Sequence, residues 1–178
     1  MIEVGDYVEF GRWFQHKNGR VLPVEWRALS IFDGVALLVS RFGLEAKRFD
    51  GNSNEWENSE IRSWLNGYFK MAFNAEELTA LDGEIFLPSY QEVKDLIPIT
   101  GCVRKCSPTP WAKARGALVD RGKCLWWTRT VSERFRRFAY VVSADGGFRQ
   151  EDFRAETYCV RPCIRVRVEA LKDDDNQI

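Results

Sequence analysis

The sequence predicts a single α+β domain, and three observations lead to this fold class. Patterns typical of strands occur at both ends of the chain, and patterns typical of helices occur between them. The chain has 178 residues, of which 45% are hydrophobic and 13% aromatic, enough for one core. No repeat or linker-like stretch divides it. We expect residues 1–170 to form the domain and the acidic residues 171–178 to form a disordered tail.

The first third of the chain is predicted to be β structure. Three segments have strand-like patterns: residues 5–15, 24–30 and 35–40. Asp33 and Gly34 form a dipeptide typical of a tight hairpin turn between the second and third segments. The third segment is almost wholly apolar, so we expect it to be the more buried strand. Residues 46–57 are polar and rich in turn formers, and should form a loop.

Helices are expected in the middle of the chain, because cap residues there precede apolar residues at helical spacing. They should begin at Asn58 or Ser59, at Asn74, at Ser89 and at Thr109. In the first helix this spacing extends to Phe69. The second and third should have capping boxes with Glu77 and Glu92. Gly83 should end the second helix, and the third should end before Pro98.

The rest of the chain is predicted to be strands and loops. Residues 84–89 should form a short strand, and residues 98–108 a loop. The second half should return to β structure after the fourth helix. Its strands are expected near residues 124–129, 137–143, 147–154 and 159–168.

Composition and charge exclude several classes of protein. Twenty-six basic and 26 acidic side chains cancel, which argues against a general nucleic-acid binder or a binder of anionic membranes. No segment has the length and hydrophobicity of a membrane span. The first residues lack the pattern of a signal peptide, so we expect a cytoplasmic protein. The sequence does not choose between a monomer and an oligomer.

Few residues offer catalytic or metal chemistry. The single histidine, His16, lies in a turn-like segment and is expected to be solvated, which leaves no histidine-based triad or multi-histidine metal site. Asp82, Glu84 and Asp120 lie near the ends of elements, where caps and turns explain them. Residues 49–58 have many oxygen donors but not the regular spacing of a calcium loop. We therefore predict no catalytic residue, no metal site and no cofactor.

Five cysteines leave three alternatives open. They lie at positions 102, 106, 124, 159 and 163. An odd number without a signal peptide favours reduced thiols packed as small apolar residues. The three-residue gaps within the pairs 102/106 and 159/163 are not those of common zinc knuckles. A metal or redox site and a disulfide remain the alternatives.

The distribution of arginine is the most informative feature. Nine of the 18 arginines lie between Thr128 and Arg167, a span with no lysine and five acidic residues. Arginine and aromatic residues are enriched in binding hot spots. For Arg165 and Arg167 we favour a solvated strand face with ion pairs to acids. We predict a ligand-binding surface within residues 128–158 that contains Arg129, Ser132, Arg134, Phe135, Arg136, Phe148, Arg149 and Phe153.

Several segments, taken together, resemble a known family. They are GDYVEFGRW, VEWRAL, ALLVSRFGLEAKRF, WENSEIRSWLNGYF, FLPSYQEV, TPWAKARGA, WWTR, AYVVSADG and YCVRPCIRV, in this order within residues 4–168. The chain resembles a bacterial domain-of-unknown-function family with a C-type-lectin-like fold. That family belongs to the superfamily of formylglycine-generating enzymes and of phage or bacterial variable binding proteins.

The resemblance implies a mixed, mostly antiparallel sheet with helices packed outside and termini close together. It also implies a ligand surface near the C-terminal strands, which a retroelement diversifies in the variable members. The matching region in this chain is residues 128–158. Cys159 and Cys163 depart from the family pattern, which has small residues on both sides of its Val-Arg-Pro motif. The copper-site motif of the enzymes and the calcium-binding sugar motif of animal lectins are both absent from the sequence.

The sequence therefore favours a non-catalytic domain that binds a protein or a small-molecule ligand. A retroelement-diversified variable protein is one version of this hypothesis. The first alternative is a cysteine- or metal-dependent enzyme of the formylglycine-generating type. The second is a structural module without a ligand site, in which residues 128–158 would be mostly covered.

Overall fold

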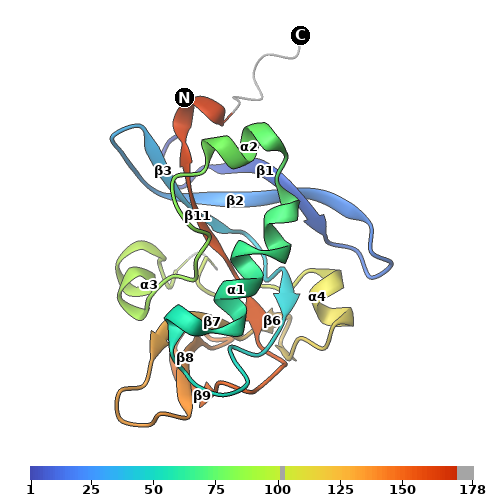
Figure 1. Ribbon diagram of the computed structural model, residues 1–178, viewed down its shortest axis with the longest axis vertical. Helices are drawn as coiled ribbons and strands as arrows, with labels where there is room; N and C mark the ends of the chain where they lie inside the picture. The colour runs from blue at the N-terminus through green and yellow to red at the C-terminus, as the bar shows by residue number, and fades with distance from the viewer. Residues whose placement is uncertain (101–102, 172–178) are drawn as a thin grey trace.

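The computed structural model describes residues 1–100 and 103–171, and its strands form two main sheets and one small one. The first main sheet has the order β1-β2-β3-β11 and lies in the upper half of Figure 1. The second has the order β4-β10-β7-β8-β9 and lies in the lower half. The strands are β1 (Tyr7–Phe14), β2 (Val21–Phe32), β3 (Val35–Ser40), β4 (Glu45–Ala46), β5 (Val119–Asp120), β6 (Lys123–Cys124), β7 (Trp126–Val131), β8 (Phe138–Val142), β9 (Phe148–Asp152), β10 (Cys159–Val160) and β11 (Cys163–Arg167).

The first main sheet confirms the prediction for the N-terminal third. All its neighbouring strands are antiparallel. Asp33 and Gly34 take the positive φ angles of 47° and 72° that a tight hairpin turn needs between β2 and β3. The alternation along β2 places Val24, Trp26 and Ala28 in the core.

The second main sheet is mixed, because β10 pairs parallel to β7 while its other pairs are antiparallel. The predicted turn between β8 and β9 is present: the Gly146 N–H donates to the Ser143 carbonyl over 2.9 Å, and Gly146 has a φ of 87°. The strands predicted for the second half of the chain are also close to those observed, with one exception.

That exception is the strand expected at residues 159–168, which is divided between the two main sheets. Cys159 pairs with β4 and β7 of the second sheet, and the segment from Cys163 pairs with β3 of the first. Pro162 has no N–H to donate to a ladder, and the buried Arg161 side chain donates to the carbonyl of Ser40, at the end of β3, and to that of Val103, outside the sheets. The chain therefore passes from one sheet to the other at these two residues.

The helices are short and lie on the outside of the sheets (Figure 1). They are η1 (Trp56–Asn58), α1 (Glu60–Asn66), η2 (Tyr68–Ala72), α2 (Ala75–Ala80), α3 (Tyr90–Leu96), α4 (Pro110–Ala114) and η3 (Val168–Ala170). Ser59, Asn74, Ser89 and Thr109 each accept a backbone N–H as caps, which confirms the four predicted starts. Asn74 and Ser89 also form the predicted capping boxes.

Three predictions for the middle of the chain are wrong. The first helix does not continue to Phe69; it ends at Asn66, and a 3-10 turn follows Gly67. Residues 84–89 form no strand, because only one isolated bridge, from Phe86 to Cys163, joins this segment to β11. The second helix ends at Ala80, before the predicted stop at Gly83, because Leu81 already has an extended backbone; the Asp82 N–H then donates to the Arg165 carbonyl over 2.8 Å.

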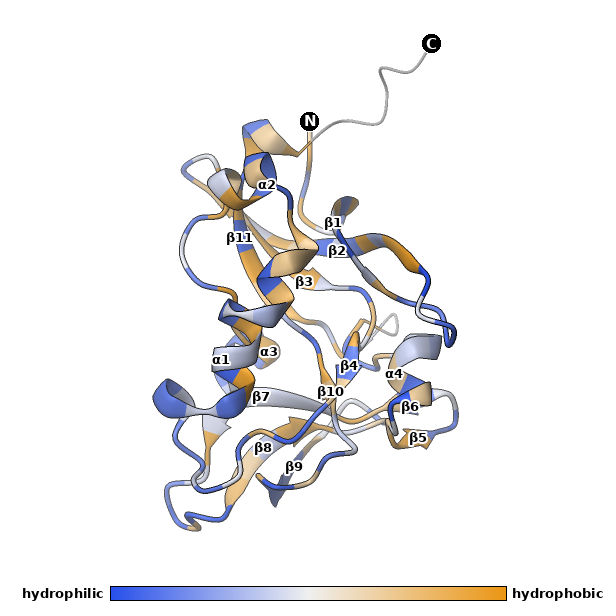
Figure 2. Ribbon diagram, turned by 45° about the vertical axis from the view of Figure 1, so that its right-hand side comes forward, coloured by the Kyte–Doolittle hydropathy of each residue, from blue (hydrophilic) through white to orange (hydrophobic). Residues whose placement is uncertain are grey.

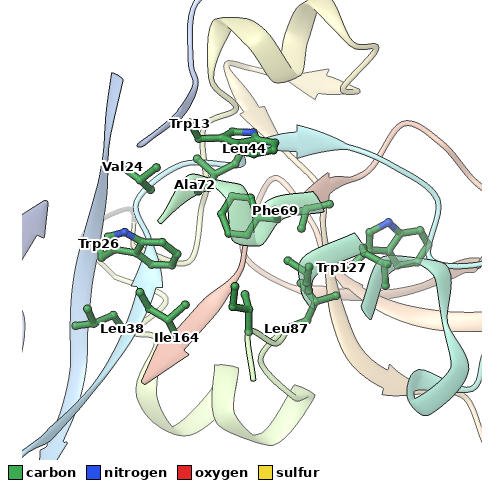
Figure 3. Close-up of a cluster of buried hydrophobic side chains, with 14 of the residues drawn as sticks. Trp13, Val24, Trp26, Leu38, Leu44, Phe69, Ala72, Leu87, Trp127 and Ile164 are labelled. Carbon is green, nitrogen blue, oxygen red and sulfur yellow. The ribbon is translucent and has the colours of Figure 1, made fainter. Parts of the chain in front are cut away.

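The core lies between the two main sheets and the helices. Figure 3 shows Trp26, Leu38 and Ile164 of the first sheet and Trp127 of the second, with Phe69 of η2 between them. A second cluster of buried side chains contains Trp126 and Cys106, Cys124, Cys159 and Cys163. Both tryptophans of the Trp126-Trp127 pair are fully buried.

The two ends of the described chain lie close together in Figures 1 and 2, where η3 is beside the N-terminus. Leu171, the first residue of the predicted tail, is buried in the main cluster. The rest of that tail, residues 172–178, and Cys102 lie outside the described residues. None of the described helices has the length and apolar character needed to cross a membrane.

Candidate functional site

The connection between β7 and β8 carries the most exposed part of the predicted surface. Arg134, Phe135 and Arg136 are all exposed, and we call these three residues the arginine tip. Phe135 is 47% exposed, which is unusual for a phenylalanine. The connection projects at the lower end of the molecule in Figure 1 and is largely hydrophilic in Figure 2.

Hydrogen bonds at its base hold the arginine tip in place. The Ser132 hydroxyl accepts the Phe135 N–H over 3.1 Å, and the Phe138 N–H donates to the Phe135 carbonyl over 3.0 Å. The buried Asn54 amide donates to the carbonyls of Ser132 and Phe138, at 3.3 and 2.9 Å. Ser132 is itself buried, so it positions the tip and is not part of the exposed surface.

The two arginines of the tip keep their charge available. Neither guanidinium has a carboxylate within 4.0 Å among the described residues, whereas the adjacent Arg137 pairs with Asp152. Arg134 lies over the Phe135 ring, 5.1 Å from its centroid. Arg–aromatic pairs of this kind present a flat, cationic surface. The tip is therefore suited to an acidic partner surface.

The other predicted ligand residues do not join the tip. Arg129 makes a bidentate ion pair with Glu92, at 2.7 and 3.0 Å, and so fixes the start of α3. Burial raises the pKa of Glu92, but the bond from Arg129 and the Ser89 N–H hold it below its ordinary 4.5. Arg149 is exposed on the edge strand β9, where it pairs with Val141.

The three phenylalanines singled out from the sequence do not form one patch. Phe148 is half-buried and packs on Tyr90 of α3, with ring centroids 4.1 Å apart. Phe153 lies in the core, not on the surface. Only Phe135 is exposed, so the surface available for binding is narrower than the predicted one.

The described cysteines are buried thiols. Cys106, Cys124, Cys159 and Cys163 are all free and buried. Burial raises the pKa of Cys106 well above its ordinary value and that of Cys163 to about 12. Both are therefore protonated near neutral pH and are poor nucleophiles. Within residues 1–100 and 103–171, no three His, Cys, Asp or Glu side chains converge as metal ligands would.

Other polar candidates have structural environments. His16 is exposed, with its Nδ1 3.0 Å from the Asn18 side-chain oxygen. Glu84 forms an ion pair with Arg62, and Asp50 of the calcium-loop candidate accepts three backbone N–H groups. Asp82 lies just after α2, and Asp120 lies in a hairpin of β5 and β6.

The expected acidic partners of the last strand are not found among the described residues. Arg165 is exposed and lies 4.5 Å from the Phe86 ring centroid. Arg167 donates to the Thr79 carbonyl. The prediction of a solvated strand face is confirmed, but a ring and a carbonyl group take the place of the expected carboxylates.

The sequence did not predict the cavity beside β4. Its lining includes Glu45 and Lys47 together with aromatic rings from four other segments. Trp111 and Trp64 are visible in the sequence only as helix residues. The cavity forms where segments that are distant in the sequence come into contact, and no local sequence pattern shows such a contact.

Comparison with known families identifies the family to which the chain belongs. A family model described as "Domain of unknown function (DUF6273)" matches residues 33–82 and 77–168. The two matches together extend over residues 33–168, well over half of the chain. The chain therefore belongs to the DUF6273 family. No curated protein and no solved structure matches it.

Proposed function

We propose that this protein is a non-catalytic binding domain that uses the arginine tip to bind an acidic segment of a partner protein. The observation that carries the proposal is the exposed Phe135 between two arginines without carboxylate partners among the described residues. Arginine and aromatic side chains contribute most of the binding energy in many interfaces. Each guanidinium of the tip can also pair with a carboxylate through two parallel hydrogen bonds.

The fixed base of the tip favours binding over a merely structural role. Asn54 and Ser132 hold the backbone on both sides of the exposed residues, so little conformational entropy remains to be lost on binding. A structural module would be expected to cover residues 128–158, and the tip within this range is exposed.

Photo-crosslinking in cells tests the proposal. A photoreactive phenylalanine replaces Phe135 in one variant and Phe32, at the β2–β3 turn, in a control variant. Phe32 is 84% exposed and carries no neighbouring arginine. We expect a discrete protein adduct from position 135 and none from position 32. Adding R134E and R136E should reduce the adduct at least about tenfold, because charge complementarity drives the encounter.

Three results would count against this function. They are the same adducts from both positions, an adduct that survives charge reversal of both arginines, and an adduct with nucleic acid instead of protein. Far-UV circular dichroism of each variant should match the wild-type spectrum, so that loss of the adduct is not loss of the fold.

We further propose that the domain has a C-type-lectin-like fold and belongs to the bacterial superfamily that includes retroelement-diversified variable proteins. The resemblance of its ordered motifs supports this, and so does the closeness of the two ends of the described chain (Figure 1). A template repeat and a reverse-transcriptase gene beside the coding sequence would support diversification. If neither lies near the gene, we would infer a binding domain whose sequence is not diversified.

The proposed compartment is the cytoplasm. Four buried free thiols support it, because a reducing compartment preserves cysteine in this form. Fractionation of cells that express the tagged protein should recover it with cytoplasmic markers.

A further inference from the structure

A cavity on another part of the molecule has the features of a small-molecule site. Its volume is about 320 Å³, within the usual range for ligand pockets. It lies where β4 meets α4, two elements that are side by side in Figure 2. None of the residues of the arginine tip lines it. Its lining consists of Phe14, Glu45, Ala46, Lys47, Trp64, Tyr68, Trp111 and Arg115.

The aromatic walls of this cavity are fixed from behind. The indole N–H of Trp111 donates to Glu45 Oε2 over 2.9 Å, and its ring lies 4.9 Å from that of Phe14. Trp64 stacks on Phe69, with centroids 5.3 Å apart and an interplanar angle of 23°. Buried Trp13 packs edge-on against Trp64 over 5.6 Å. A planar ring entering the cavity would therefore meet walls that are already in place.

The lining residues carry one more positive charge than negative charge, which favours an anionic ligand. Glu45 is the single carboxylate among the lining residues, and its side chain is only 9% exposed. It accepts the Trp111 N–H and lies 3.6 Å from the Arg115 guanidinium. Lys47 has no carboxylate within 4.0 Å among the described residues; its ammonium lies 5.5 Å from the centroid of the Trp64 ring. One positive charge is therefore left over, on Lys47.

We propose that this cavity binds a planar aromatic small molecule that carries one anionic group. The ring packs against Trp64 and Trp111, and the anionic group pairs with Lys47. The long aliphatic stem of lysine lets the ammonium leave the Trp64 ring for the anion. A cationic ligand would instead be repelled by the charges of Lys47 and Arg115 in the lining. This site is independent of the arginine tip.

Three probes with the same ring and different charge test the proposal by isothermal titration calorimetry of the full chain. They are indole-3-acetate (anionic), 3-methylindole (neutral) and tryptamine (cationic). We expect indole-3-acetate to bind roughly tenfold more tightly than either of the others, because one ion pair in a partly enclosed site has about this effect. K47M should reduce the affinity for indole-3-acetate to that for 3-methylindole.

Matched controls separate this site from the rest of the surface. K17M removes the same charge at the exposed turn between β1 and β2 and should leave the affinity unchanged. The R134E/R136E variant should also bind indole-3-acetate normally, so failure of the tip and failure of the cavity are distinguishable. Tighter binding of tryptamine, equal effects of K47M and K17M, or no saturable binding of any probe would each overturn the proposal.

Discussion

At the scale of a single residue, Asp50 shows how one carboxylate organises a loop. Its Oδ2 accepts the N–H groups of Asn52 and Ser53, both over 2.8 Å, and its Oδ1 accepts the N–H of Glu60 over 3.0 Å. Glu60 is the first residue of α1. Burial raises the pKa of the Asp50 carboxyl, but the backbone N–H groups outweigh burial and hold it below its ordinary 3.8.

This depressed pKa predicts the sign of a pH effect. The ionised Asp50 contributes its full stability well above the ordinary pKa of 3.8, and the contribution is lost as the pH falls through the lower, folded value. D50N should lower the free energy of unfolding by about 1–3 kcal/mol at pH 7, because an amide accepts fewer of the N–H groups. The difference from wild type should shrink toward pH 3. Urea unfolding at several pH values measures it.

The control for this prediction is D82N, which removes an exposed carboxylate after α2. It should change stability at pH 7 far less than D50N does. If D50N remained as stable as D82N, or if its deficit grew at acidic pH, the hydrogen bonds to Asp50 would not be what stabilises this loop.

At the scale of helices and strands, the Glu77 side chain links α2 to β1 through hydrogen bonds. Its Oε2 accepts the Asn74 N–H in the capping box over 2.8 Å, and its Oε1 accepts the Gly11 N–H over 2.9 Å. Gly11 lies at the irregularity of β1 with a φ of 70°, and a Cβ there would lie 2.6 Å from the Phe73 ring. The glycine therefore lets the strand approach the helical segment, and Glu77 holds it there.

Removing this carboxylate should weaken both the helix cap and the link to the strand. E77A is expected to lower the free energy of unfolding by about 1–3 kcal/mol, since two backbone N–H groups lose their acceptor. E77Q, which keeps one side-chain oxygen, should lie between E77A and wild type. The neighbouring E76A removes an exposed carboxylate of the same first turn and serves as the matched control. Equal losses for E76A and E77A in chemical unfolding would disprove the link.

Sequence signals at the ends of helices and strands gave the most reliable structural predictions. Caps at Ser59, Asn74, Ser89 and Thr109 and the Asp33-Gly34 turn depend on neighbouring residues, and all were predicted correctly. The strand expected at residues 84–89 depended on apolar character alone. This segment meets β11 only at the isolated bridge from Phe86 to Cys163, and a pattern of apolar residues cannot distinguish such a bridge from a strand.

At the scale of the whole molecule, the candidate sites were predictable only in part. The exposed Arg134-Phe135-Arg136 run is contiguous in sequence, so composition alone located the tip. Phe153 also has an arginine beside it, Arg154, but its side chain lies in the core, because burial depends on the packing of the two main sheets. The cavity brings together residues from Phe14 to Arg115, and no local pattern contains that proximity.

The two main sheets meet at Arg161, where the chain passes from β10 to β11. This residue is 2% exposed, and no described carboxylate lies within 4.0 Å of it. Its Nε donates to the Ser40 carbonyl at the end of β3, and its Nη1 to the Val103 carbonyl, both over 2.8 Å. The guanidinium also lies 4.9 Å from the ring centroid of Trp126 in β7. One side chain thus contacts both main sheets.

Replacing this side chain tests whether the two main sheets unfold as one unit. R161M leaves two buried carbonyls without a donor, so it should lower the free energy of unfolding by about 2–4 kcal/mol. Circular dichroism and tryptophan fluorescence should shift together, because both sheets share one core. R165M, on the exposed face of β11, should cost less than about 1 kcal/mol. Separate transitions for the two probes in the wild-type protein would show instead that the sheets belong to independent units.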